Sequence, residues 1–252
     1  MECPCPYRAA VGGNLLWLAY APNGRAHGGH RLVALDGFDV QLSIPTEPIL
    51  GMASGREGDS ICLLRSSPGA GPEWTPIDGQ GTVGHSISFP GASRMWVAGG
   101  TLWILAKEGV AWSLDGQPSG WGSPRAWTLP SPIGQDRLVG SELWLRCGAS
   151  SQGWGRLDPE RGWVAERSDP WMPPQIASAS TRSPTRRAWG EAVAIHGVSQ
   201  GTGWLVEQPD SLWRMDPQGR PLWGQGGFGY IEQVLALGST EVPQNLTRAN
   251  PK

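Results

Sequence analysis

One stretch of the chain, Gly100 to Gln117, returns without a gap at Gly201 to Gln218. Gly, Thr, two Trp, Asp and Gln recur at the same offsets in both copies. Looser copies also end in a hydrophobic residue followed by Asp, and the closing Asp residues are Asp36, Asp78, Asp115, Asp158 and Asp216. Because these residues are spaced by about 40 positions, the sequence predicts repeated supersecondary units that stack to bury a shared core.

The composition favours short strands over helices. Of 252 residues, Gly accounts for 37, Pro for 23 and Trp for 15. Short apolar runs alternate with Gly- and Pro-rich turns, and helical periodicity is almost absent, which is typical of all-β proteins. A chain of this length buries roughly 70 to 75% of its unfolded surface, so neither disulfides nor a metal are needed for it to fold.

Each repeat is expected to contain four strands. The five repeats are predicted at residues 9–45, 49–89, 94–129, 137–167 and 191–224. A single four-stranded antiparallel sheet leaves both faces and both edges open, whereas sheets arranged radially cover one another. Trp103, Trp144 and Trp204 each lie in the second strand of a repeat, and we expect these indoles to fill the space between neighbouring sheets.

Residues 100–104 (GTLWI), 108–110 (EGV) and 114–115 (LD) resemble the short β-propeller repeat of the periplasmic sensor regions of two-component regulators. Residues 216–223 (DPQGRPLW) are similar to the hairpin of quinoprotein-type propeller repeats. The resemblance implies an all-β propeller of about five four-stranded blades. It implies no single function, because such repeats occur on propellers of unrelated function.

One propeller domain is expected over residues 9–237, after an N-terminal lead of residues 1–8 and before a flexible tail of residues 238–252. The Pro- and Ser-rich segment 168–190 is unsuited to a strand ladder and is expected to be a loop insertion. The alternative is six blades, if Tyr230 to Leu237 and a strand within the insertion complete another.

The Asp that closes each repeat has two interpretations. Asp-Gly and Asp-Pro pairs begin turns in which the carboxylate accepts hydrogen bonds from its own loop. We favour this structural role. The alternative is that the Asp residues line one face of the ring as metal or substrate ligands.

The net charge of -2 gives no basic surface, so neither nucleic acid nor an anionic membrane is an expected partner. No apolar run is long enough to cross a bilayer, and the first residues lack the pattern of a secretory signal. Four Cys are too few for a disulfide framework in a chain of this length. These features together predict a cytoplasmic protein.

Metal binding and catalysis are both secondary hypotheses. Cys3, Cys5, His27 and His30 contain the residue types of a tetrahedral zinc site, but their spacing matches no known zinc finger, so unligated surface residues and no cofactor are expected. His85 and His196 are placed in predicted strands, where an imidazole is usually structural. The sequence has no nucleophile elbow, phosphate loop or dinucleotide motif, so we do not expect an enzyme.

Several residues depart from the repeat and are the predicted partner-binding residues. They are Trp121, Trp171, Met172, Arg182, Arg186, Arg187 and Trp189. Aromatic residues and Arg in loops are enriched at protein interfaces, although the insertion has the alternative interpretation of an ordinary surface loop.

The function predicted from these features is a non-catalytic scaffold or adaptor for protein partners, by analogy part of a bacterial regulatory or defence assembly. A lectin-like glycan-binding propeller is the first alternative, because loop indoles also stack on sugars. A propeller hydrolase that uses Asp or Glu from loops is the second.

Overall fold

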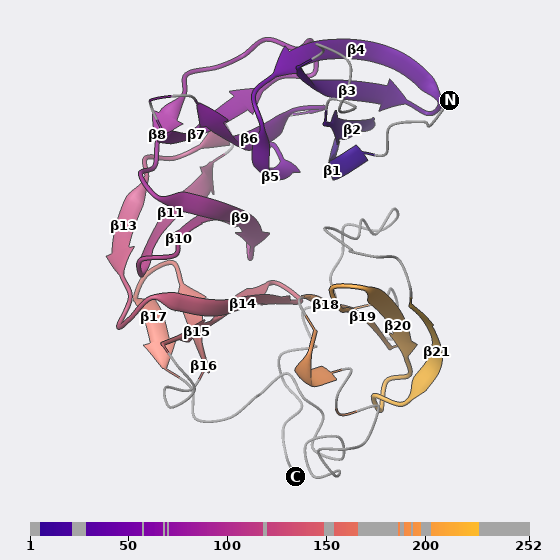
Figure 1. Ribbon diagram of the computed structural model, residues 1–252, viewed down its shortest axis with the longest axis vertical. Coiled ribbons are helices and arrows are strands. Elements are labelled where there is room, and N and C mark those ends of the chain that lie inside the picture. Colours follow the sequence, from indigo (N-terminus) through magenta and orange to yellow (C-terminus); the bar gives the residue numbers. More distant parts are fainter. Residues whose placement is uncertain are drawn as a thin grey trace. The chain divides into compact units, whose positions relative to one another are not determined.

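The structure is a computed structural model. It describes residues 6–21, 29–56, 58–67, 69, 71–117, 120–148, 154–165, 186, 189–192, 194–197 and 203–226. The chain forms two compact units, Met1–Pro132 and Ile133–Lys252, and each is described by itself. Every named element within the described residues is a β-strand (Figure 1).

The first sheet of unit 1 contains β1 (Pro6–Gly12), β2 (Leu15–Tyr20), β3 (His30–Asp36) and β4 (Asp39–Thr46). Each strand pairs antiparallel with the next along the chain, in the order β1-β2-β3-β4. Burial alternates strictly along β2, as expected for a strand with one face against a core.

The second sheet contains β5 (Ile49–Ser54), β6 (Ile61–Ser67), β7 (Gly71–Ile77) and β8 (Ile87–Ser88) in the same order. Its first strand, β5, lies against β1 of the first sheet. The two sheets share one hydrophobic cluster, to which Trp17 and Leu32 contribute from the first sheet and Ile61 and Leu63 from the second.

The third sheet contains β9 (Ala92–Ala98), β10 (Thr101–Ala106), β11 (Val110–Gln117) and β13 (Arg125–Thr128). A short strand, β12 (Gly120–Trp121), pairs with the end of β11. β9 lies against β5, and all six residues of β10 are buried. The repeat segment that is most conspicuous in the sequence is therefore the most completely buried strand of this sheet.

Unit 2 begins with a fourth sheet, formed by β14 (Ile133–Val139), β15 (Glu142–Cys147), β16 (Trp154–Asp158) and β17 (Gly162–Ala165). The strands pair antiparallel in chain order, like those of the first three sheets.

The fifth sheet contains β18 (Ala194–Gly197), β19 (Trp204–Glu207), β20 (Ser211–Met215) and β21 (Pro221–Gly226). Its first strand runs parallel to β14, with Leu138 opposite Ala194 and Val139 opposite Ile195. This short parallel contact joins two antiparallel four-stranded sheets edge to edge into one of eight strands (Figure 1).

The predicted all-β fold of five four-stranded units is confirmed at the level of the strands and their pairing. Trp103 and Trp144 are buried as predicted, whereas Trp204 is half-buried against the core of unit 2. Two details differ: β8 is shorter than the predicted strand and excludes His85, and β12 was not predicted.

The prediction of one domain over residues 9–237 and the closure of the blades into a ring stay predictions. The alternative sixth blade depends on Tyr230 to Leu237 and on an insertion strand, which fall almost entirely outside the described residues. Within the described part of the chain, no helix has the length and apolar character needed to cross a bilayer.

Candidate functional site

Three of the five closing Asp residues, Asp78, Asp158 and Asp216, hold turns together, as the favoured interpretation predicted. The Asp78 carboxylate accepts hydrogen bonds from the N–H groups of Gln80 (2.9 Å) and Thr82 (2.8 Å). In the same way the Asp216 carboxylate accepts the N–H of Arg220 at 2.8 Å. A carboxylate that is used in this way by its own loop is poorly placed to bind a metal or substrate.

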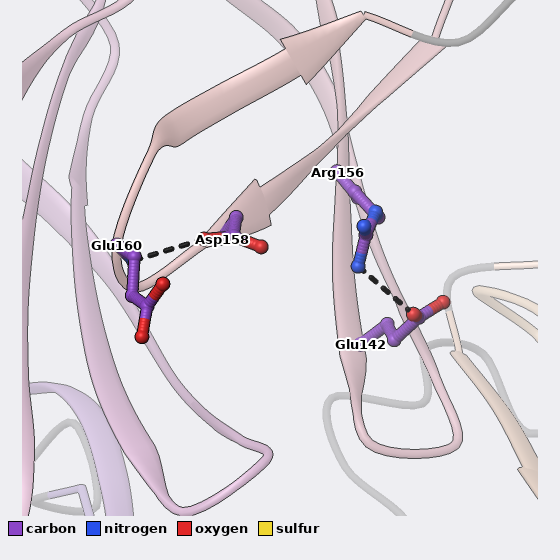
Figure 2. A network of polar contacts seen from close by, with 4 residues as sticks. All are labelled: Glu142, Arg156, Asp158 and Glu160. Atoms are coloured by element: carbon purple, nitrogen blue, oxygen red, sulfur yellow. Dashed lines mark hydrogen bonds and ion pairs between the residues drawn. The ribbon is translucent and has the colours of Figure 1, made fainter.

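Asp158 has the same arrangement at the end of β16. Its Oδ1 accepts the N–H groups of Glu160 at 2.9 Å and Arg161 at 3.0 Å, and Figure 2 shows the first of these bonds. The same view shows Arg156 paired with Glu142 across the neighbouring strands, at 3.4 Å. The hydrogen bond from Glu160 is the largest cause that lowers the pKa of Asp158 below its ordinary value of 3.8.

Trp121, a predicted partner-binding residue, lies in β12 and is half-buried. The guanidinium carbon of Arg56 lies 5.2 Å from the centroid of the indole ring, and Arg56 also donates to the carbonyl of Gly100 at 3.1 Å. The ring itself packs against the hydrophobic cluster of the second and third sheets. One side of the indole is thus covered by a cation and another by the core, and its role in partner binding stays a prediction.

The indole N–H groups of Trp121 and Trp74 face the sulfur of Cys62, a weak acceptor, and make no conventional hydrogen bond. Burial raises the pKa of the Cys62 thiol to about 12, and the two indoles offset this only in part. Cys62 is therefore a neutral core thiol that fills the position occupied by Trp in other repeats.

Trp189 is not the exposed loop indole that the sequence suggested. Its exposed fraction is 0%, its Nε1 donates to the carbonyl of Gly219 at 3.3 Å, and its ring meets Trp204 edge-on with centroids 5.8 Å apart. The prediction of an accessible Trp189 is corrected, because the indole completes the core of the fifth sheet instead.

The remaining predicted residues of the insertion are only partly described. Arg186 is half-buried, whereas Trp171, Met172, Arg182 and Arg187 lie outside the described residues, and their role stays a prediction.

Of the weak zinc candidates, only His30 is described; Cys3, Cys5 and His27 lie outside the described residues. The Tyr7 hydroxyl accepts the N–H of Ile49 at 3.0 Å and lies 3.1 Å from His30 Nδ1, so its proton is available to that nitrogen. One imidazole nitrogen of His30 thus contacts the Tyr7 hydroxyl, and this hydroxyl connects the first two sheets through Ile49. Among the described residues, no group of three or more potential metal ligands comes together.

The two remaining histidines differ in their surroundings. His85 is exposed and precedes β8. His196 Nε2 lies 3.4 Å from Glu207 Oε2, and the Glu207 side chain is only 5% exposed. The His196–Glu207 contact joins β18 and β19, which are paired strands of the fifth sheet.

Exposed apolar side chains that the sequence patterns did not single out lie at the turn between β3 and β4 and the start of β4, between β7 and β8, and in β21. They are Phe38, Val40, Val83, Leu222 and Trp223. Phe38 was obscured because it stands inside an Asp-Gly turn signal, and Leu222 and Trp223 because they belong to a predicted repeat strand. An aromatic residue at a turn position that needs none was the available signal for Phe38.

Neither a family model nor a curated protein matches the chain. Among solved structures, the chain is similar to BamB from Moraxella catarrhalis, with 14% sequence identity and a TM-score of 0.42. The match covers 86% of this chain and 60% of the BamB chain. At this level of similarity, no function is transferred from BamB to this protein.

Proposed function

We propose that this protein is a non-catalytic scaffold that binds a protein partner through exposed apolar residues on the outer strands of its sheets. The observation that carries the proposal is the exposure of β21, because all six of its residues are exposed. Leu222 is 60% exposed and Trp223 48% exposed.

Successive residues of a strand point to opposite faces of the sheet. The exposure of both Leu222 and Trp223 therefore means that the described residues leave both faces of β21 about half open or more at this position. β21 is also the last strand in the order of its sheet among the described strands, so one edge of its backbone is open to a partner. Trp is among the residues most enriched at the energetic centres of protein interfaces.

The two alternative functions receive less support. Of the loop indoles on which the glycan-binding alternative was based, Trp121 lies under the Arg56 guanidinium and Trp189 is fully buried. A hydrolase that uses the closing Asp residues would need free carboxylates, and three of the five, Asp78, Asp158 and Asp216, are engaged by their own turns. A protein partner therefore remains the preferred class of ligand.

The cellular setting belongs to the proposal as well. Cys62 and Cys147 are both buried free thiols, which agrees with a reducing compartment such as the cytosol. A place in a bacterial regulatory or defence assembly, and the contribution of the insertion at 168–190, are further parts of the proposal.

The test is affinity purification of the tagged chain at native expression, with quantitative mass spectrometry of the proteins that co-purify. We expect Leu222→Ser combined with Trp223→Ser to deplete a specific partner by about tenfold or more. Gln225→Ser, an exposed polar position on the same strand, is the matched control and should leave the partner bound. Equal recovery with all three chains, or recovery of no protein specific to the wild type, would contradict the proposal. A glycan array with the same variants tests the lectin alternative.

A further inference from the structure

The turn between β3 and β4 presents an aromatic side chain that touches nothing else in the described residues. Phe38 has 102% of its reference area exposed, and the neighbouring Val40 is 64% exposed. Asp36 pairs with Asp39, so only Gly37 and Phe38 form the turn (Figure 1 shows the two strands). Because the ring stays in water, its apolar area contributes no burial free energy to folding.

The turn does not require a Phe at this position. A two-residue hairpin turn that fits the twist of its strands needs a positive φ at its first position, and Gly37 supplies it with φ of 60°. Gly37 has no neighbouring atom within 4 Å of where a Cβ would stand, so backbone conformation alone explains this glycine. The second position accepts polar residues freely, and the aromatic residue therefore has no structural reason within the hairpin.

The hairpin holds the backbone at Phe38 in a defined position. β3 and β4 are paired from His30 and Thr46 to Asp36 and Asp39. Arg31 adds side-chain hydrogen bonds across the pair, from Nε (3.1 Å) and a terminal nitrogen (2.9 Å) to the Ser43 hydroxyl. A side chain at the end of a well-paired hairpin loses little backbone freedom on binding, which favours its use as an anchor.

A bulge in β4 explains why Val40 joins Phe38 on the surface. Leu35 pairs with Val40 and Ala34 with Leu42, so Gln41 is left over. Because neighbouring residues of β3 point to opposite faces, the bulge places Val40 on the face opposite Leu42. Leu42 packs on the core of the first two sheets, and Val40 points away from that core.

Charge restricts the class of partner. Asp36 and Asp39 are directly opposite each other and both exposed, and like charges in this position repel. Within the described residues neither has an ion-pair partner, so a cation from outside would relieve the repulsion. The same two carboxylates disfavour nucleic acid and an anionic membrane surface at this turn.

We infer that the turn at Asp36 to Val40 is the anchor by which this scaffold holds its partner, and that the partner is a protein with an apolar pocket edged by Lys or Arg. The inference rests on the proposed function and adds a second, separate contact to β21. Phe38 enters the pocket, Val40 extends the apolar contact, and the two carboxylates meet the basic edge.

The test places the photo-crosslinking residue p-benzoylphenylalanine at position 38 of the full chain in its native cells. Position 41, an exposed residue of the adjoining strand β4, is the matched control. We expect a crosslinked partner from position 38 and none from position 41, with the yield reduced about tenfold when Asp36→Lys and Asp39→Lys are introduced. The identified partner, once purified, should bind Phe38→Ser about tenfold or more weakly than wild type at an unchanged melting temperature.

Four results overturn the inference: no adduct at 38, an equal adduct at 41, a crosslink within the chain or to a second copy, and an adduct that the two Lys substitutions leave unchanged. If the β21 variants still lose a partner in any of these outcomes, the proposed function stands and only this anchor is wrong. If the wild type captures no specific protein at all, the proposed function fails as well.

Discussion

The indole N–H of Trp17 donates a hydrogen bond to the backbone carbonyl of Asp59 at 3.1 Å, which ties β2 of the first sheet to the loop between β5 and β6 of the second. Asp59 makes a further connection, because its carboxylate accepts the N–H of Asn14 at 2.7 Å. A repeat Trp thus joins neighbouring sheets by a directional bond as well as by packing.

Trp17→Phe removes that bond and part of the ring volume while retaining an aromatic side chain. We expect the free energy of unfolding to fall by about 1–3 kcal/mol, because Trp17 is fully buried and the Asp59 carbonyl loses its donor. Urea denaturation measures the change. Trp223→Phe, at an exposed indole, should have almost no effect, and equal losses for the two variants would contradict the role given to the Trp17 bond.

Gly155→Ala should destabilise unit 2 because β16 and β17 approach closely there. A Cβ at Gly155 would overlap the indole ring of Trp163, which lies across it. The ring cannot move far without breaking the packing of β17, so we expect a cost of about 1–3 kcal/mol. Gly190→Ala is the control, since nothing lies within 4 Å of the added carbon. Thermal melting should show a lower melting temperature for Gly155→Ala than for Gly190→Ala. Similar melting temperatures for the two variants would argue against the close packing of Trp163 on Gly155.

The lowered pKa of Asp158 predicts how the stability of the protein changes with pH. Because the turn hydrogen bonds favour the charged carboxylate in the folded state, its contribution is present above the ordinary pKa of 3.8 and is lost as pH falls through the lowered folded value. Asp158→Asn should therefore lower the melting temperature at pH 7, and the difference from wild type should shrink below about pH 3.8.

Glu160→Gln removes a neighbouring charge from the same turn and is the control for general charge effects. A difference between wild type and Asp158→Asn that stays constant from pH 7 to pH 2 would show that the carboxylate charge is not what stabilises this turn.

Cys62 and Cys147 should be unreactive in the folded protein. Burial raises the pKa of Cys62 to about 12 and that of Cys147 to about 11, so the reactive thiolate is scarce at neutral pH and the sulfur atoms are covered. Iodoacetamide labelling followed by peptide mass spectrometry should find both modified only in denaturant. Rapid labelling of either residue in native buffer would contradict its place in the core.

The repeat was sufficient to predict most of the strands, because a Trp or Leu that recurs at one offset marks the same core position in each sheet. β10 and β15 begin and end at the residues expected from the sequence. The edges of the sheets were harder to predict. His85 was assigned to a strand because polar and apolar residues alternate over residues 86–89, but β8 contains only Ile87 and Ser88, since alternation does not show where the pairing of an outer strand ends.

Partner-binding residues were predicted less well, because sequence position does not reveal burial outside the repeat. Trp189 and Trp121 both depart from the repeat, yet Trp189 is fully buried and Trp121 is half-buried beneath Arg56. Phe38 stands inside a turn signal and Trp223 inside a predicted strand, yet both are exposed. The structure separates these two groups because it places Phe38 in the turn before β4 and Trp223 in β21, the last described strand of its sheet.

The central claim is that the repeated Trp residues form the core and that function resides in exposed apolar residues on outer strands. It is tested most directly by measuring melting temperature and partner recovery together for Trp103→Ala and Trp223→Ser. Trp103 is 1% exposed, so its replacement should cost about 3–5 kcal/mol of stability. Trp223→Ser should keep the wild-type melting temperature and lose the partner. The account is contradicted if Trp223→Ser retains full partner recovery, or if Trp103→Ala melts like the wild type.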